Sequence, residues 1–189
     1  MKTINLPNKL TVARIILTPI FLALFLSDIP NHFLWGLIVF AIGSFTDFLD
    51  GKIARKRQIV TVFGKLADPV ADKILTTAAL LALMQNGLCN IWIIMIVLLR
   101  EFTITSFRLV ATAQGIVIPA NIYGKLKTVS QMVFSLVIML LAHLSEKGLT
   151  GSLDIPLISN CMLWITAVLC VISGVIYVKQ SIKLIDFSK

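Results

Sequence analysis

Long apolar runs separated by short polar stretches dominate the chain. A helix needs about 20 mainly apolar residues to cross the hydrocarbon core of a bilayer, and the sequence contains six runs near that length. They lie near residues 12–27, 33–49, 69–86, 91–111, 126–144 and 157–178. The first run is the weakest, because Arg14 sits in its opening turn and Pro19 would kink it. It reaches spanning length only if Arg14 snorkels to the interface. The pattern predicts six transmembrane helices.

Composition also favours a membrane environment. Hydrophobic residues make up 58% of the 189 residues and the mean hydropathy is +0.95. Charged residues make up 14%, against roughly 25% in an ordinary globular protein. No repeat or linker divides the chain, so we expect an all-α integral membrane protein with one domain, residues 1–189. No small-residue cleavage site follows the first run, so we expect that run to be retained and not removed as a signal peptide.

Basic residues gather in every second polar stretch. They are Lys2, Lys9, Lys52, Arg55, Lys56, Arg57, Lys65, Arg108, Lys125, Lys127, Lys179, Lys183 and Lys189. The other stretches, SDIPNH, QNGLCN and SEKGLTGSLDIP, hold one Lys and three acidic residues. Because cytoplasmic loops collect Lys and Arg, we expect both termini at the cytoplasmic face of the plasma membrane. The net charge of +8 would then attract anionic membrane lipid. Nucleic-acid binding would need a basic face with aromatic platforms in water, which this composition does not supply.

Four of the nine acidic residues lie within 26 residues of one another. Helical spacing places Asp47 with Asp50 at the end of the second run, and Asp68 with Asp72 at the start of the third. A basic loop, residues 56–67, would join the two helices. Four such carboxylates repel one another unless a cation lies between them. Oxygen ligands without nearby His or Cys favour Mg²⁺ or Mn²⁺, and two ions would suit a phosphoryl displacement.

Solvated loop charges paired with basic neighbours are the alternative for this cluster. Ionisable residues at membrane depth are costly and usually functional, which favours the metal site. Gly51 lacks a Cβ and lets a bulky ligand approach the backbone, and Gly64 could do the same or turn the loop. Arg55 suits a phosphate. The cysteines, Cys89, Cys161 and Cys170, lack the spacing of a zinc site or a disulfide framework.

The carboxylates belong to a longer pattern, D-x-x-D-G-x-x-A-R-x(8)-G-x-x-x-D-x-x-x-D. It is matched by Asp47, Asp50, Gly51, Ala54, Arg55, Gly64, Asp68 and Asp72. This pattern resembles the signature of the CDP-alcohol phosphotransferases, membrane enzymes that move a phosphatidyl or related group from a CDP donor to an alcohol. Size and the six expected spans match that family over nearly the whole chain.

The resemblance implies a role for each matched residue. Asp47, Asp50 and Asp68 would hold a pair of Mg²⁺ or Mn²⁺ ions, and Asp72 would lie near the second ion and act as general base on the acceptor hydroxyl. Gly51, Ala54 and Arg55 would lie against the CDP moiety, with Gly64 nearby. A homodimer is also implied. The residues themselves do not select which carboxylate is the base.

Two further stretches extend the expected site. NLPNKLTVARI, residues 5–15, is typical of a short interfacial helix leading into the first span, with Asn8 and Thr11 on the donor side. Helix capping by Asn8 or Thr11 is the alternative. LLREFTITSFRLVA, residues 98–111, puts Arg100 and Glu101 inside the fourth span, where they could merely pair within the bundle.

Basic residues near the cytoplasmic face bear on the acceptor. Arg108, Lys125 and Lys127, with Arg55, would form a pocket that suits an acceptor carrying its own phosphate. This favours sn-glycerol 3-phosphate over serine, choline or inositol, with CDP-diacylglycerol as the donor. Snorkelling is the alternative for Lys125 and Lys127. The PNKLT, REF…R and GKLKT stretches resemble the phosphatidylglycerophosphate synthase branch of the family.

Two other functions fit parts of the pattern. The same chemistry could use another alcohol, as in cardiolipin-type or phosphatidylinositol-phosphate-type synthases. A six-span cation-coupled transporter could also place acids in its helices. A transporter, however, should have broken helices and carboxylates near the midplane in symmetry-related halves. Here the acids cluster at one interface in the first half of the chain only.

Overall fold

A computed structural model describes residues 6–57, 62–116, 118–119 and 121–185, without the side chains of residues 6–10, 47–57, 62–69 and 72. This part of the chain folds into six helices and contains no strand. They are α1 (Leu6–Phe25), α2 (His32–Arg57), α3 (Val62–Gln85), α4 (Ile91–Ala113), α5 (Ile122–Glu146) and α6 (Ile155–Leu184). Each covers all or most of one of the six apolar runs, so the predicted all-helical class is confirmed.

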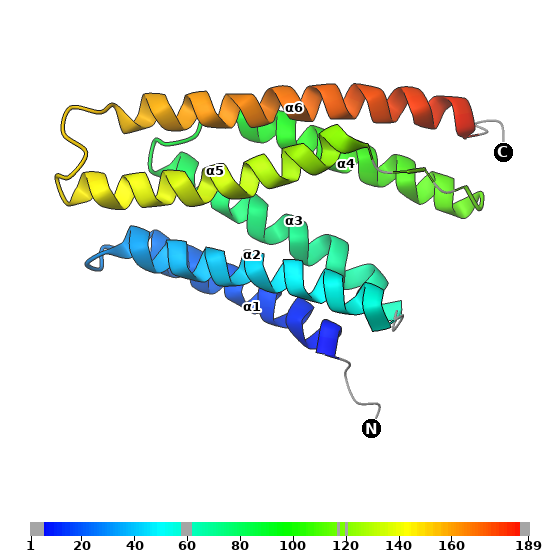
Figure 1. The fold of residues 1–189 in the computed structure, drawn as a ribbon, viewed down its shortest axis with the longest axis horizontal. Helices are drawn as coiled ribbons and strands as arrows, with labels where there is room; N and C mark the ends of the chain where they lie inside the picture. The colour runs from blue at the N-terminus through cyan, green and yellow to red at the C-terminus, as the bar shows by residue number, and fades with distance from the viewer. Residues whose placement is uncertain (1–5, 58–61, 117, 120, 186–189) are drawn as a thin grey trace.

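The helices form two groups joined by α3 and α5. α1 packs against α2 and α3, whereas α6 packs against α4 and α5. α3 runs obliquely between the two groups, and α5 also lies along α2 (Figure 1). α3 packs far less extensively against α4 than against α1. Polar bonds between α3 and α4 therefore contribute a large share of what holds these two helices together.

One end of the bundle collects the segments that sequence analysis singled out. α1 begins and α6 ends there, and so do the end of α2, the start of α3, the end of α4 and the start of α5 (Figure 1). The three connections that hold few basic residues, 26–31, 86–90 and 147–154, lie at the opposite end. The carboxylate-bearing helix ends therefore share one end of the bundle with the basic residues at the start of α5.

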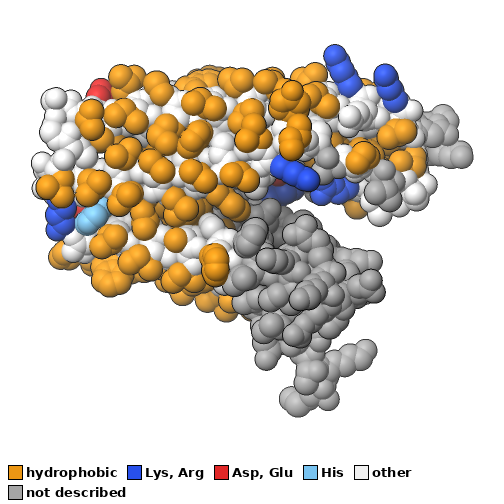
Figure 2. Space-filling model, in the orientation of Figure 1, with side chains coloured by type: hydrophobic (Ala, Val, Ile, Leu, Met, Phe, Trp, Pro, Cys, Tyr) orange, Lys and Arg blue, Asp and Glu red, His pale blue; other side chains and the backbone are white. Residues whose placement is uncertain are grey.

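Two helices in the described part of the chain, α5 and α6, are long and apolar enough to cross a bilayer. Three shorter apolar segments are Thr11–Phe25, His32–Thr46 and Lys73–Gln85. α4 is long enough, but Arg100, Glu101 and Arg108 interrupt its apolar sequence. Large apolar side chains cover the face seen in Figure 2, over α5 and α6. Leaving that much apolar surface in water would cost about 25 cal/mol per Å².

Aromatic rings and two glycines pack α1 and α3 closely against α2. The Phe21 ring lies 5.4 Å from that of Phe25 and 5.8 Å from that of Phe40, and all three side chains are fully buried. Gly36 faces Phe25 and Gly43 faces Leu75, each so closely that a Cβ would overlap the neighbouring side chain. Glycine at these positions lets the helices approach, which fixes the end of α2 relative to α1 and α3.

The structure corrects two predicted boundaries. The basic loop expected over residues 56–67 is wrong, because α2 continues to Arg57 and α3 begins at Val62. Gly64 and Lys65 suggested a loop. In a helix, however, each destabilises by no more than about 1 kcal/mol relative to Ala. The separate interfacial helix before the first span is also wrong, since α1 is continuous from Leu6 to Phe25. No residue between 8 and 18 breaks a helix, so the two predicted pieces merge.

Candidate active site

The predicted metal-binding carboxylates lie on the two helices expected from the sequence. Asp47 and Asp50 are in the last turns of α2, and Asp68 and Asp72 are in the first half of α3. Spacings of three and four residues put each pair on one face of its helix. The side chains of all four lie outside the described part of the structure, so the metal cluster stays a prediction. Within the described side chains, no group of three His, Cys, Asp or Glu residues could hold a metal ion.

The predicted donor-binding residues follow the same helices. Gly51, Ala54 and Arg55 lie on α2, Gly64 lies on α3 and Asn8 lies on α1, and the side chains among them are not described. Thr11 is described and its side chain is fully buried; its contact with the donor stays a prediction. Neither Asn8 nor Thr11 is the N-cap of α1, because the helix already begins at Leu6; the capping alternative is wrong.

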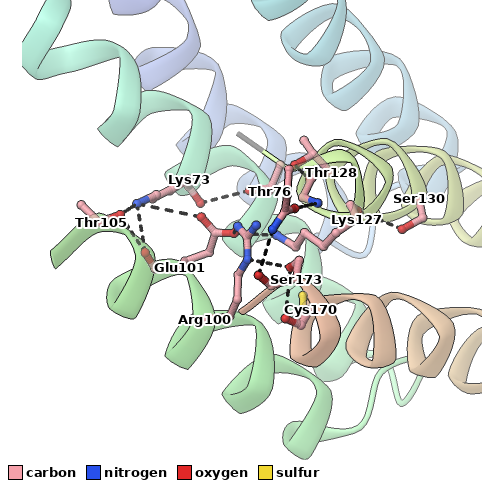
Figure 3. Close-up of polar contacts among 12 residues, drawn as sticks. Lys73, Thr76, Arg100, Glu101, Thr105, Lys127, Thr128, Ser130, Cys170 and Ser173 are labelled. Atoms are coloured by element: carbon pink, nitrogen blue, oxygen red, sulfur yellow. Dashed lines mark hydrogen bonds and ion pairs between the residues drawn. The ribbon is translucent and has the colours of Figure 1, made fainter. Parts of the chain in front are cut away.

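A described cluster of charged residues is centred on Glu101, near the middle of α4 (Figure 3). Arg100 Nη1 donates to Glu101 Oε1 over 2.6 Å, and Lys127 Nζ of α5 donates to the same oxygen over 2.8 Å. Glu101 Oε2 lies 3.9 Å from Lys73 Nζ of α3. One carboxylate thus connects α3, α4 and α5.

Lys73 has further contacts that hold α3 beside α4. Its ammonium group donates to the backbone oxygen of Glu101 over 3.4 Å and to the hydroxyl of Thr105. The Thr105 hydroxyl in turn donates to the backbone oxygen of Glu101 over 2.7 Å. Lys73 directly follows Asp72 in the sequence, so these bonds fix the rotation of α3 at the predicted catalytic carboxylate.

The Arg100 side chain also bonds to Ser173 of α6, which in turn bonds to the residue that caps α5. Its Nε donates to Ser173 Oγ over 3.2 Å, and the Ser173 backbone oxygen accepts from the Asn121 amide over 3.2 Å. Asn121 is also the N-cap of α5, accepting from the Gly124 backbone N–H over 2.6 Å. A Cβ on Gly124 would lie 3.0 Å from Arg100 Nη2. The missing side chain at Gly124 therefore makes room for the guanidinium group.

Among the side chains that the structure describes, the cluster carries more positive than negative charge. The cations Arg100, Lys73 and Lys127 surround the one described carboxylate, that of Glu101. The side chain of Lys127 is 5% exposed and that of Arg100 is 13% exposed. Buried charges are costly unless paired, so a partly buried site in which Arg100 and Lys127 share one carboxylate oxygen is suited to receive an anion.

The three predicted acceptor-binding residues fall into two environments. Arg108 and Lys125 are exposed at the ends of α4 and α5. Lys127 is buried and paired with Glu101, so its ammonium group does not snorkel to the surface. The pairing that was the alternative for Arg100 and Glu101 is present. Whether Arg108, Lys125 and Lys127 bind an acceptor phosphate stays a prediction.

Sequence reasoning missed Lys73, Asn121 and Ser173 as members of this cluster. Lys73 could have been found, because it directly follows Asp72 within the signature region. Asn121 stands before the GKLKT stretch and has the residue type of an N-cap. Ser173 carries no sequence signal, because its role depends on which face of α6 packs against α4 and α5.

Comparison with known proteins gives one family. Residues 4–172 match the model of the CDP-alcohol phosphatidyltransferase family. A Bacillus subtilis protein named CDP-diacylglycerol–glycerol-3-phosphate 3-phosphatidyltransferase is 40% identical over an alignment of 186 positions. The alignment covers 90% of this chain and 91% of that protein. A Rickettsia bellii protein of the same name is 36% identical over 179 residues, covering 95% of this chain and 96% of that protein.

Proposed function

Because the chain belongs to the CDP-alcohol phosphatidyltransferase family, we propose that it transfers the phosphatidyl group of CDP-diacylglycerol to sn-glycerol 3-phosphate, giving phosphatidylglycerophosphate and CMP. The observation that carries the proposal is the likeness to two relatives named for this reaction, each matched over 90% or more of both chains. The chain is thus a transferase of phospholipid biosynthesis.

We further propose that all six helices cross the plasma membrane, with both termini and the site at the cytoplasmic face. The apolar side chains exposed over α5 and α6 support a lipid environment, and the position of the basic residues supports the orientation. Membrane lipid would surround the bundle and let the acyl chains of the donor remain in the bilayer. The expectation of a homodimer rests on the family resemblance alone.

The residue types on α2 and α3 fit a site for two divalent cations. Asp47, Asp50 and Asp68 would hold the two ions, with Asp72 beside the second. The donor set consists only of carboxylates on two adjoining helix ends, and such hard oxygen ligands suit Mg²⁺ or Mn²⁺. When bound, the ions supply charge neutralisation at the pyrophosphate of the donor.

In the proposed reaction, Asp72 accepts the proton of the acceptor's primary hydroxyl group. The hydroxyl oxygen forms a bond to the phosphorus that carries diacylglycerol, and the bond from this phosphorus to the CMP oxygen breaks. Arg55 would face the phosphates, whereas Gly51 and Ala54 would let the cytidine part approach α2 closely. Asn8, Thr11 and Gly64 would complete the donor side.

The proposed acceptor site consists of three basic residues on α4 and α5. Lys127 would hold the acceptor phosphate from the interior of the bundle, and Arg108 and Lys125 would attract it from the exposed ends of α4 and α5. Charge-assisted hydrogen bonds to phosphate are the strong ones. An acceptor with its own phosphate is therefore favoured over serine, choline or inositol. The competing assignment is the same chemistry with another alcohol, as in cardiolipin-type or phosphatidylinositol-phosphate-type synthases. Membership of an enzyme family leaves the transporter alternative without support.

The proposal is tested by CMP release from CDP-diacylglycerol by the detergent-purified protein with Mg²⁺ present. Glycerol 3-phosphate, glycerol, serine, inositol and phosphatidylglycerol are offered separately. We expect release with glycerol 3-phosphate at least about tenfold above the others, because one lost bond to a charged group costs about 1.5 kcal/mol or more. Equal or faster release with another acceptor would reassign the substrate.

The acceptor pocket makes a separate prediction. Arg108→Gln and Lys125→Gln should each raise the KM for glycerol 3-phosphate by about three- to tenfold, because each removes a partly solvated charge from the path of the phosphate. The KM for CDP-diacylglycerol should change less than about twofold. Lys179→Gln, which removes an exposed charge from α6, is the matched control. Equal changes in both KM values would reject the pocket assignment.

A further inference from the structure

Lys127 depends on Glu101 more than the other two cations do. Within the described part of the chain, Glu101 Oε1 is the one hydrogen-bond partner of Lys127 Nζ, at 2.8 Å. Arg100 is also held by Ser173, and Lys73 is also held by Thr105 and by a backbone oxygen. Removing the Glu101 carboxylate would therefore leave Arg100 and Lys73 with partners but release Lys127.

The position of Lys127 makes this dependence consequential. A lysine side chain has four rotatable bonds and usually extends its ammonium group toward water. Lys127 is buried on α5, two residues after the exposed Lys125. Its ammonium group pairs with Glu101 of α4 (Figure 3). The carboxylate of Glu101 thus selects one conformation among many and offsets the cost of keeping the charge in the interior.

The shared oxygen also sets a spacing between two cations. Arg100 Nη1 and Lys127 Nζ both donate to Glu101 Oε1, at 2.6 and 2.8 Å. Arg100 and Lys127 thus face a common point, and the single charge of Glu101 does not neutralise both of them. A phosphate with three oxygens can bind such a pair without displacing the carboxylate, because each donor group has further N–H bonds.

We propose that Glu101 is a positioning residue for the acceptor, holding Lys127 where its ammonium group binds the phosphate of glycerol 3-phosphate. This inference rests on the proposed function. Glu101 does not itself contact the substrate; it acts through Lys127. Loss of the carboxylate weakens acceptor binding and leaves donor binding intact, because Lys73 keeps its bonds to Thr105 and to the Glu101 backbone oxygen and still holds α3.

A double-mutant cycle tests the inference, with Glu101→Gln, Lys127→Met and the double variant. Glu101→Gln and Lys127→Met should each raise the KM for glycerol 3-phosphate about tenfold or more, since each removes a charge-assisted bond. If Glu101 acts through Lys127, the double variant should have the same KM as Lys127→Met, within about twofold. The KM for CDP-diacylglycerol should stay within about twofold of the wild-type value in all three.

Additive effects would overturn the inference, because about a hundredfold rise in the double variant means that Glu101 acts by another route. A rise in the KM for CDP-diacylglycerol that matches the rise for glycerol 3-phosphate would also overturn it. Glu146→Gln is the matched control: it removes a carboxylate from the opposite end of α5, where Glu146 lies 3.8 Å from His143. This control should leave both KM values unchanged.

Folding does not make the test ambiguous. Glu101→Gln could fail to fold, since it leaves the charge of Lys127 uncompensated, but the double variant removes both charges. A folded double variant with the KM of Lys127→Met supports the inference even then. A double variant that does not fold, when Lys127→Met does, would overturn it. Failure of the wild-type protein to use glycerol 3-phosphate would reject the proposed function instead, and the two failures are thus distinguished.

Discussion

Asp72→Asn is expected to lower kcat for CMP release by about 10²- to 10⁴-fold, the range that a positioned general base contributes. The amide keeps the size of the side chain but cannot accept the hydroxyl proton. The KM for glycerol 3-phosphate should change little, because the phosphate is bound by other residues. The measurement is steady-state CMP release at saturating donor and acceptor.

Two comparisons make the Asp72 result specific. Asp28→Asn removes an exposed carboxylate at the opposite end of the bundle and should leave kcat unchanged. Binding of Mn²⁺ to the Asp72→Asn protein separates loss of the base from loss of an ion. Turnover close to the wild-type rate, with unchanged Mn²⁺ affinity, would mean that another group removes the proton.

Removal of divalent cations is expected to reduce CMP release to the rate without enzyme. Four carboxylates on adjoining helix ends repel one another, and the pyrophosphate of the donor adds further negative charge. Excess EDTA should therefore abolish activity, and Mg²⁺ or Mn²⁺ added back should restore it. Asp47→Asn and Asp50→Asn should each raise the concentration of Mg²⁺ needed for half-maximal rate, because each removes one charged ligand.

The chelation experiment needs a control for folding. Thermal unfolding of the detergent-purified protein, with and without EDTA, reports whether the bundle survives removal of the cations. We expect it to survive, because the described core consists of buried aromatic and aliphatic side chains, whose packing needs no cation. Undiminished CMP release in excess EDTA would reject the two-ion site and the roles assigned to Asp47 and Asp50.

The fold was largely predictable because apolar runs of spanning length have few structural alternatives. Boundaries were less predictable, and the reason is visible at residues 56–67. Charged residues and Gly64 resemble a loop in sequence, yet a helix tolerates them once its neighbouring turns are formed. The same reasoning applies at Leu6, where a polar N-terminal stretch continues directly into the apolar part of α1.

The candidate site divides along similar lines. The carboxylates of α2 and α3 could be predicted because they lie close in sequence at helical spacing. The cluster around Glu101 could not, because its members come from four helices and its contacts depend on helix rotation. Lys127 illustrates the limit: its sequence context equally allows a snorkelling side chain, and only the ion pair with Glu101 of α4 decides between a buried and a snorkelling ammonium group.

The polar cluster becomes complete only when α6 has been synthesised, because Ser173 lies on this last helix. α6 follows the other five helices in the chain, so it emerges from the ribosome after they do. Until then, Arg100 lacks its hydroxyl acceptor on Ser173 and the Asn121 amide lacks its carbonyl acceptor. A chain that ends before α6 therefore leaves the Arg100 Nε and the Asn121 amide without these acceptors, at the cost of unpaired polar groups in the interior of the bundle.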